Sequence, residues 1–236
     1  MTIQTEVKNI ISELKEKGRP ERLEFMKTMV NSSMTMLGVS AEDMRFVLKR
    51  INTEIKNQSV TGILSLAKQL IETDILECQM MSYELIGKNK RVMEQMTEED
   101  MFNLIGKMDN WGSVDSFSVL ISGVLWNMGK IKDETVLNWL KSDDYWIRRI
   151  AVVSTVSLNM KSHGGKGDAK RTLMICEKVI GDKNNMIIKA LSWALRALYN
   201  SGKHDDVKEF MNKYDNELAP RVKREVWTKI RTGRKN

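Results

Sequence analysis

The sequence predicts an all-α protein. Only 2 of the 236 residues are Pro, and helix-forming residues such as Leu, Ile, Met, Lys and Glu are abundant. Apolar residues recur at steps of three and four in nearly every segment, which is the period of an amphipathic helix. Runs of alternating polarity bounded by turn residues, the usual signal of a strand, are absent. Together these observations argue against most β architectures.

The apolar period predicts a succession of short helices. Residues suited to N-caps support three of the starts: Ser40 precedes Ala-Glu-Asp, Thr97 precedes Glu-Glu-Asp and Asp133 precedes Glu-Thr-Val. The expected helices cover residues 4–16, 20–36, 41–57, 60–72, 75–88, 98–107, 113–129, 133–141, 144–160, 168–180, 184–200, 204–213 and 218–231.

Three similar segments each open a long helix after a turn. They begin at Asp109, Asp144 and Asn184, at intervals of 35 and 40 residues. A period near 40 with two helices per unit is typical of HEAT-like repeats. We therefore expect residues 1–236 to form one domain, a right-handed HEAT-like solenoid (an α-α superhelix) with one concave face that suits an elongated ligand. Helix N-termini along that face would offer free N–H groups to a phosphate backbone.

The positive charge is concentrated at the C-terminus. The formal net charge is +7, and residues 219–236 alone carry +6. Clustered cations favour a polyanion such as nucleic acid or a membrane surface. An ordinary solvated helix end is the alternative. The basic residues of this segment are Arg221, Lys223, Arg224, Lys229, Arg231, Arg234 and Lys235.

The composition argues against metal, redox and membrane-spanning classes. Cys78 and Cys176 lie far apart in apolar helical segments, so buried and reduced thiols are expected. His163 and His204 lie in turns and suggest no metal site. The first residues reach charge too early for a signal peptide, and no apolar run is long enough to cross a bilayer. We expect a soluble cytoplasmic protein without histidine-based catalysis.

One pair of residues is a candidate for chemistry. Trp111 and Asp115 are four positions apart, so a helix would place an indole and a carboxylate on one face. The alternative interpretation is a core tryptophan followed by an acid in the first turn.

Two later segments combine indoles with cations. Residues 146–149 read Trp-Ile-Arg-Arg, and residues 189–196 carry a lysine, an indole and a guanidinium at spacings of about one turn. A packed indole with two surface cations accounts for the first segment taken alone, and amphipathic packing accounts for the second. The residues concerned are Trp146, Arg148, Arg149, Lys189, Trp193 and Arg196.

Four segments follow one another along the chain in a fixed order. They are Trp111-Gly-Ser-Val-Asp115, Tyr145-Trp-Ile-Arg-Arg149, Lys189-Ala-Leu-Ser-Trp193-Ala-Leu-Arg196 and Glu217-Leu-Ala-Pro-Arg-Val-Lys-Arg224. In this order they resemble the AlkD family of DNA alkylation repair glycosylases. Weaker similarity at residues 34–39 and 76–79 extends the resemblance over almost the whole chain.

The resemblance implies a monofunctional glycosylase that removes 3- and 7-alkylated purines from double-stranded DNA without a cofactor and without cutting the strand. It implies that Asp115 is the catalytic carboxylate, that Trp111 and Trp193 lie against the sugar-phosphate of the lesion, and that Arg149 is a neighbouring cation. It also implies tolerance of bulky adducts and, in the cell, association with the nucleoid; we expect a monomer. The residues implied to hold the DNA are Arg148, a poorer match than Arg149, with Lys189, Arg196, Arg221, Lys223 and Arg224.

Two other functions stay open. A catalytically silent HEAT-like module could bind DNA or a protein partner, because a fold does not fix a function. The Trp, Asp and Arg set favours the enzyme, since a scaffold has no need for an acid on a surface that faces phosphate. A membrane-surface protein that uses its basic C-terminus is the third alternative, but the cations lack an adjacent face of Trp or Phe.

Overall fold

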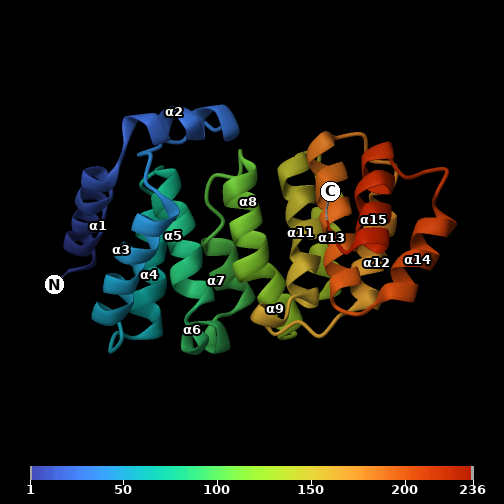
Figure 1. Cartoon of the computed structure of the whole chain (residues 1–236). Helices are drawn as coiled ribbons and strands as arrows, with labels where there is room; N and C mark the ends of the chain where they lie inside the picture. Colours follow the sequence, from blue (N-terminus) through green and yellow to red (C-terminus); the bar gives the residue numbers. More distant parts are fainter. Residues whose placement is uncertain (1, 235–236) are drawn as a thin grey trace. The chain divides into compact units, whose positions relative to one another are not determined.

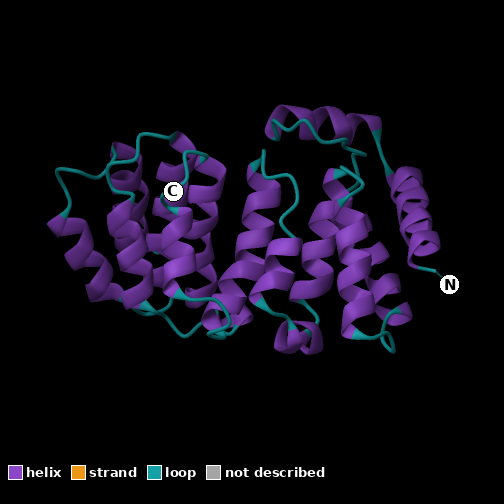
Figure 2. Cartoon of the chain, turned by 180° about the vertical axis from the view of Figure 1, so that it is seen from behind, coloured by secondary structure: helices purple, strands orange, loops and turns teal. Residues whose placement is uncertain are grey.

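The computed structural model describes residues 2–234, and its helices confirm the all-α prediction (Figures 1 and 2). Within the described residues, the only strand-like pairing is a single parallel bridge between Thr35 and Ile75. Lys235, one of the basic residues named above, lies outside this range. The chain divides into two compact units, Met1–Ile121 and Ser122–Asn236. The single domain and the HEAT-like superhelix stay predictions.

The first unit is built around two central helices. Its helices are α1 (Ile3–Lys17), α2 (Pro20–Met29), α3 (Ala41–Glu54), α4 (Val60–Ile71), α5 (Leu76–Gly87), α6 (Lys90–Gln95), α7 (Glu98–Asn103) and α8 (Trp111–Phe117). Helix α4 packs against α1, α5 and α6, while α5 also contacts α3 and α8. The side chains of Ser40 and Thr97 cap α3 and α7 as predicted. Helix α8 is thereby supported by the buried helix α5.

Helix α2 differs from the other helices of this unit. It lies crosswise at one end of them (Figures 1 and 2), and none of its residues is buried. The prediction that this helix continues to residue 36 is wrong, because it ends at Met29. The hydroxyl groups of Ser32 and Ser33 donate instead to Asp109, which lies just before α8. Polar side chains that bond elsewhere in this way compete with helix continuation.

The second unit is centred on α11 and α13. Its helices are α9 (Gly123–Asn127), α10 (Asp133–Trp139), α11 (Tyr145–Asn159), α12 (Ala169–Lys178), α13 (Asn185–Asn200), α14 (His204–Lys213) and α15 (Pro220–Thr232), with a 3₁₀ turn, η2 (Lys161–His163). Helix α11 packs against α9, α10, α12 and α13, and α13 also contacts α14 and α15. The segments at Asp144 and Asn184 form the N-caps of α11 and α13. These two central helices carry most of the predicted cations and Trp193.

Three local predictions need correction. Helix α6 was not expected; Asn89 starts it by accepting a hydrogen bond from the amide of Val92. The helix expected over 113–129 begins at Trp111 and contains a π-helical segment, η1 (Ser118–Ser122). Asp133 is the first residue of α10 rather than its N-cap, because its carboxylate accepts a hydrogen bond from the indole of Trp126 at 2.8 Å.

Both cysteines are buried free thiols, as predicted. Burial raises the pKa of the Cys78 thiol to about 12 and also raises that of Cys176. The protonated thiol is the inert form at neutral pH.

Candidate functional site

Trp111 is the first residue of α8 and lies at the surface of the first unit. Asn110 caps the helix by accepting a hydrogen bond from the amide of Ser113 at 2.9 Å. The Trp111 side chain is 39% exposed, and its indole Nε1 donates to the backbone carbonyl of Met29 at 2.9 Å. The interpretation of Trp111 as a core residue is therefore wrong. One edge of the indole is bound, and part of the ring remains open to solvent.

Asp115 lies one turn after Trp111 on the same short helix. The helix from 111 to 117 confirms that the two residues share a face, as their spacing predicts. Asp115 is partly buried, whereas Val114 and Phe117 on the other side of the helix enter the core. Packing of Phe117 edge-on against Tyr83 of α5 fixes the rotation of α8. Val114 and Phe117 thus anchor the helix in the core, while Trp111 and Asp115 are less deeply buried.

Asp109, two residues before Trp111, joins α8 to the segment after α2. Its carboxylate accepts from the Ser32 hydroxyl at 2.6 Å, from the amide and hydroxyl of Ser33 at 2.8 and 2.7 Å, and from the side-chain amide of Asn110 at 3.0 Å. Burial by itself would raise the pKa of the Asp109 carboxyl, but these hydrogen bonds outweigh it and hold the pKa at about 2. Asp109 is thus ionised at neutral pH, and its carboxylate joins the segment after α2 to the start of α8.

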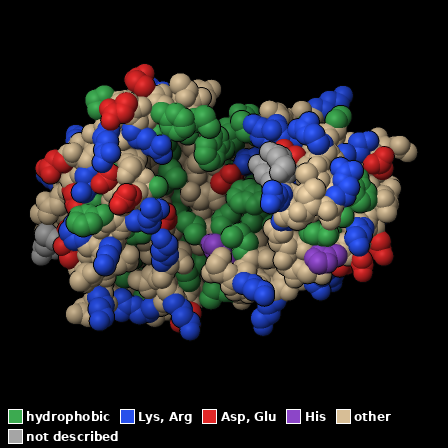
Figure 3. All heavy atoms as spheres, in the orientation of Figure 1, with side chains coloured by type: hydrophobic (Ala, Val, Ile, Leu, Met, Phe, Trp, Pro, Cys, Tyr) green, Lys and Arg blue, Asp and Glu red, His purple; other side chains and the backbone are tan. Residues whose placement is uncertain are grey.

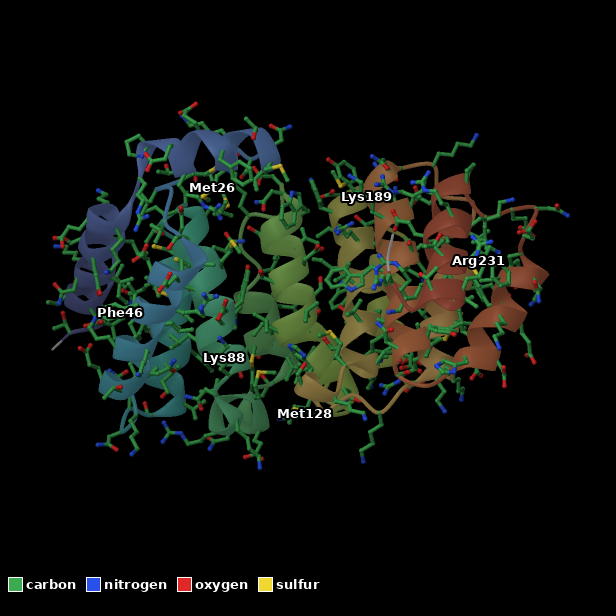
Figure 4. All side chains as sticks on the ribbon, viewed as in Figure 1. Met26, Phe46, Lys88, Met128, Lys189 and Arg231 are labelled. Carbon is green, nitrogen blue, oxygen red and sulfur yellow. The ribbon has the colours of Figure 1, made fainter. Side chains whose placement is uncertain are left out.

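An apolar cavity of about 230 Å³ lies beside Trp111, under α2. Phe25 and Met29, at 52% and 54% exposure, lie at this cavity together with Trp111. Figure 3 shows hydrophobic side chains gathered on the surface over the end of α2 and the start of α8, and Figure 4 shows Met26 on the inner side of α2. The surface around the candidate indole is therefore apolar.

In the second unit, Arg149 and Trp193 lie on the two central helices. Arg149 of α11 is buried and donates to the backbone carbonyl of Met186 in α13. Trp193 is partly exposed on α13, one turn after Lys189, which Figure 4 labels. The packed interpretation of Trp146 is confirmed, because its indole is 9% exposed. Arg149 thus has a fixed position, and part of the Trp193 indole is open to solvent.

Several of the predicted DNA-binding cations already have acidic partners. Arg148 binds Asp182 at 3.0 Å and the carbonyls of Ser142 and Asp143. Lys223 lies 3.6 Å from a carboxylate oxygen of Asp215. The positive charge at each of these two positions is therefore offset by a carboxylate within the unit.

Glu225 of α15 is buried and collects three partners. It accepts hydrogen bonds from Ser192 at 2.7 Å and Arg221 at 2.9 Å, and it lies 3.5 Å from a guanidinium nitrogen of Arg196. Burial opposes ionisation of Glu225, but the bonds from Arg221 and Ser192 and the charge of Arg196 lower its pKa. This carboxylate joins α13 to α15 and partly neutralises both arginines.

Lys189 and Arg224 differ from these cations. Lys189 is partly exposed and Arg224 is exposed, and no ion pair to either is found within residues 2–234. Figure 3 shows Lys and Arg side chains spread over α13 and α15. Among the six cations predicted to hold DNA, these two have the fewest competing partners for a phosphate.

The chain also matches a family of known proteins. Residues 10–230 match the model of a family described as DNA alkylation repair enzyme. The chain belongs to this family. No match was found among curated proteins.

Family membership points to DNA alkylation repair and to an enzyme, and it agrees with the resemblance found in the sequence. A repair enzyme of this kind acts on DNA, which suits the apolar and basic residues described above. None of the described helices has the length and apolar character needed to cross a bilayer.

Sequence reasoning missed the support of the candidate residues. The sequence marks Asp109 only as the start of a repeated segment, and the apolar period predicts Ser32 and Ser33 inside a helix. A possible signal was the Asn-Ser-Ser run at residues 31–33, because such residues favour caps and turns over helix interiors. The partner of that run, 76 residues further along the chain, has no signal in the sequence.

Proposed function

We propose that this member of the DNA alkylation repair family is a glycosylase that excises cationic 3- and 7-alkylated purines from duplex DNA. The observation that carries the proposal is the placement of Asp115 one turn after an exposed indole, Trp111, on a helix fixed against the core. The family match supports repair of alkylated DNA in general. The glycosidic bond is the one that such a site can break without a cofactor.

The positive charge of the substrate makes protonation of the leaving base unnecessary. A purine alkylated at N3 or N7 is already cationic, so it leaves as a neutral base and needs no general acid. Water adds to C1′ of the sugar, the pair of electrons in the glycosidic bond goes to the base, and one proton is released. What has to be stabilised is the oxocarbenium-like sugar, as in glycoside hydrolysis.

Asp115 supplies the charge that this transition state needs. A carboxylate about 4 Å from the sugar, at an effective dielectric near 20, contributes on the order of 4 kcal/mol. This corresponds to roughly a thousandfold in rate. The same carboxylate can orient the water and take its proton. One acidic residue is therefore sufficient for the reaction.

The indoles would select the cationic lesion. In the proposal, Trp111 and Trp193 lie against the sugar-phosphate and attract the positive charge, a cation–π interaction worth about 2 kcal/mol in a desolvated site. Arg149 is proposed to contact the DNA as a further cation. The helical units hold the phosphate backbone, and Lys189 and Arg224 are the strongest candidates because of their exposure. Arg148, Arg196, Arg221 and Lys223 contribute less, since each has a partner within its unit.

The product is an intact strand that carries an abasic site. Strand cleavage by a glycosylase needs a lysine nucleophile activated in a desolvated pocket. The proposed chemistry uses water instead, and we propose that the enzyme acts as a monomer.

The test is incubation of the purified chain with methylated duplex DNA, followed by chromatography of the released bases. Free 3-methyladenine or 7-methylguanine, together with abasic sites in unbroken strands, is the expected result. Asp115→Asn is expected to slow release roughly a hundredfold to a thousandfold, because it removes the charge and keeps the shape.

Asp74→Asn is the matched control. Asp74 is an acid of the same unit that pairs with Lys107 at 3.4 Å, and its φ of 55° is one that Asn tolerates. It should release bases at the wild-type rate. Tight binding of methylated DNA without release of any base would reject the glycosylase and favour the silent binding module.

A further inference from the structure

We propose that Asp109 is a positioning residue that sets the orientation of the Trp111 indole by holding the end of α2 against α8. This inference rests on the proposed function, because it assigns Trp111 to the lesion. The observation behind it is a pair of hydrogen-bonded links: Asp109 accepts hydrogen bonds from Ser33, and the Trp111 indole donates to the carbonyl of Met29, four residues before Ser33 in the chain.

The carbonyl of Met29 lies at the end of α2. Met29 is the last residue of α2, and the last four carbonyls of a helix have no partner within it. The Trp111 indole N–H donates to this carbonyl at 2.9 Å. The place of the α2 end therefore decides where the edge of the indole lies.

Hydrogen bonds to Asp109 hold the segment that follows α2 in place. No residue of α2 is fully buried, and Met26 is partly buried against the apolar cluster around Leu76, so packing alone holds this helix less firmly than a core helix. Four residues later the chain is held by Asp109, which accepts three hydrogen bonds from Ser32 and Ser33. Charge-assisted hydrogen bonds of this kind are short and directional. They hold the segment against Asp109, which lies just before α8.

Apolar packing attaches the segment after α2 to the protein independently of Asp109. Val30 and Met34, on either side of the two serines, are buried in an apolar cluster with Leu76. This cluster keeps the segment on the protein when Asp109 is changed. Asp109→Asn should therefore fold, and its effect should be felt in the orientation of Trp111 rather than in the integrity of the unit.

The direct readout is fluorine NMR of protein labelled with 5-fluorotryptophan. The chain has six tryptophans, and the resonance of Trp111 is assigned by its loss in Trp111→Phe. Asp109→Asn is expected to shift or broaden the Trp111 resonance and to leave the other five unchanged. Asp100→Asn is the matched control, because Asp100 also accepts hydrogen bonds from a backbone amide and a hydroxyl, both of Thr97, in a cap of the same unit.

The kinetic readout is single-turnover release of base by four proteins: wild type, Asp109→Asn, Trp111→Phe and the double variant. Asp109→Asn is expected to slow release about tenfold, since small misplacements of a catalytic group are costly. In the Trp111→Phe background the same change should cost less than twofold, because the indole N–H through which it acts is gone.

An unchanged Trp111 resonance in Asp109→Asn, or an equal loss of rate in both backgrounds, would overturn the positioning role. If the wild type releases no base at all, the proposed function fails, and the fluorine spectrum alone then decides whether Asp109 orients the indole. The two failures are therefore distinguishable.

Discussion

Asp109→Asn should also remove a pH-dependent part of the stability of the first unit. The pKa of this carboxyl is about 2 in the folded chain, against an ordinary value of 3.8. Because one pKa unit corresponds to about 1.4 kcal/mol, the difference sets an upper bound of about 2.4 kcal/mol at neutral pH. Asp109 is partly exposed, so solvent screening reduces the expected contribution to about 1 kcal/mol.

The lowered pKa of Asp109 determines in which direction stability changes with pH. The folded state has the lower pKa, so the stabilisation is fully present above the unfolded value of 3.8 and is lost as the pH falls toward 2. The difference in unfolding free energy between wild type and Asp109→Asn should thus be constant at pH 5 to 6. By pH 3 it should have fallen to about half.

The assay is urea unfolding followed by circular dichroism at several pH values between 3 and 6. Comparison of the two proteins at each pH cancels the titration of all other carboxyls. A difference of the same size at pH 3 and pH 6 would refute the reasoning, because it would trace the effect to shape rather than to charge. Equal stability of the two proteins at pH 6 would refute it as well.

Three further predictions concern other parts of the molecule. Glu225→Gln should destabilise the second unit by about 3 kcal/mol, because it leaves the Arg196 side chain without its buried partner; since the pKa of Glu225 is lowered, the wild type should lose this stabilisation as the pH falls through that pKa. Lys189→Ala and Arg224→Ala should each weaken DNA binding and reduce the salt slope by about 0.9, as measured by fluorescence anisotropy. Gly87→Ala should destabilise the first unit by about 1–3 kcal/mol in thermal unfolding, because its Cβ would lie 2.8 Å from a backbone oxygen of η1.

The chain offers a matched control for each of these variants. Glu209 is exposed, so Glu209→Gln should leave stability unchanged, and an equal loss there would remove the argument from burial. Lys8 is an exposed lysine of α1, and a salt slope that Lys8→Ala reduces as much would mean unspecific attraction. A Cβ at Gly181 would meet no atom within 4 Å, so Gly181→Ala should be tolerated; if Gly87→Ala is tolerated equally, the close approach of α5 to η1 does not matter.

Much of the fold and part of the site could be predicted from the sequence. The period of apolar residues gave the helices, because burial of one face is a local pattern. Trp111 and Asp115 share a face because their spacing is close to one helical turn, which any helix would impose. The short helix α6 was missed because only six residues and one cap, Asn89, define it.

The tertiary hydrogen bonds could not be predicted. Asp133 is a residue type that favours the N-cap position. Its carboxylate instead accepts a hydrogen bond from the indole of Trp126, and Asp133 becomes the first residue of α10. Ser32 and Ser33 lie in a segment whose pattern predicts a continuous helix, but α2 ends at Met29 and their hydroxyl groups donate hydrogen bonds to Asp109 instead. In both cases the deciding partner is distant in the chain or on another helix, where no local pattern announces it.

The absence of buried residues in α2 has a practical consequence. Core positions resist change, because every altered methylene is felt by close-packed neighbours. The outward positions of α2 are free of that constraint, while the serines that follow it keep the backbone in register. A library that randomises these outward positions should therefore diversify the rim beside Trp111 while the fold is kept.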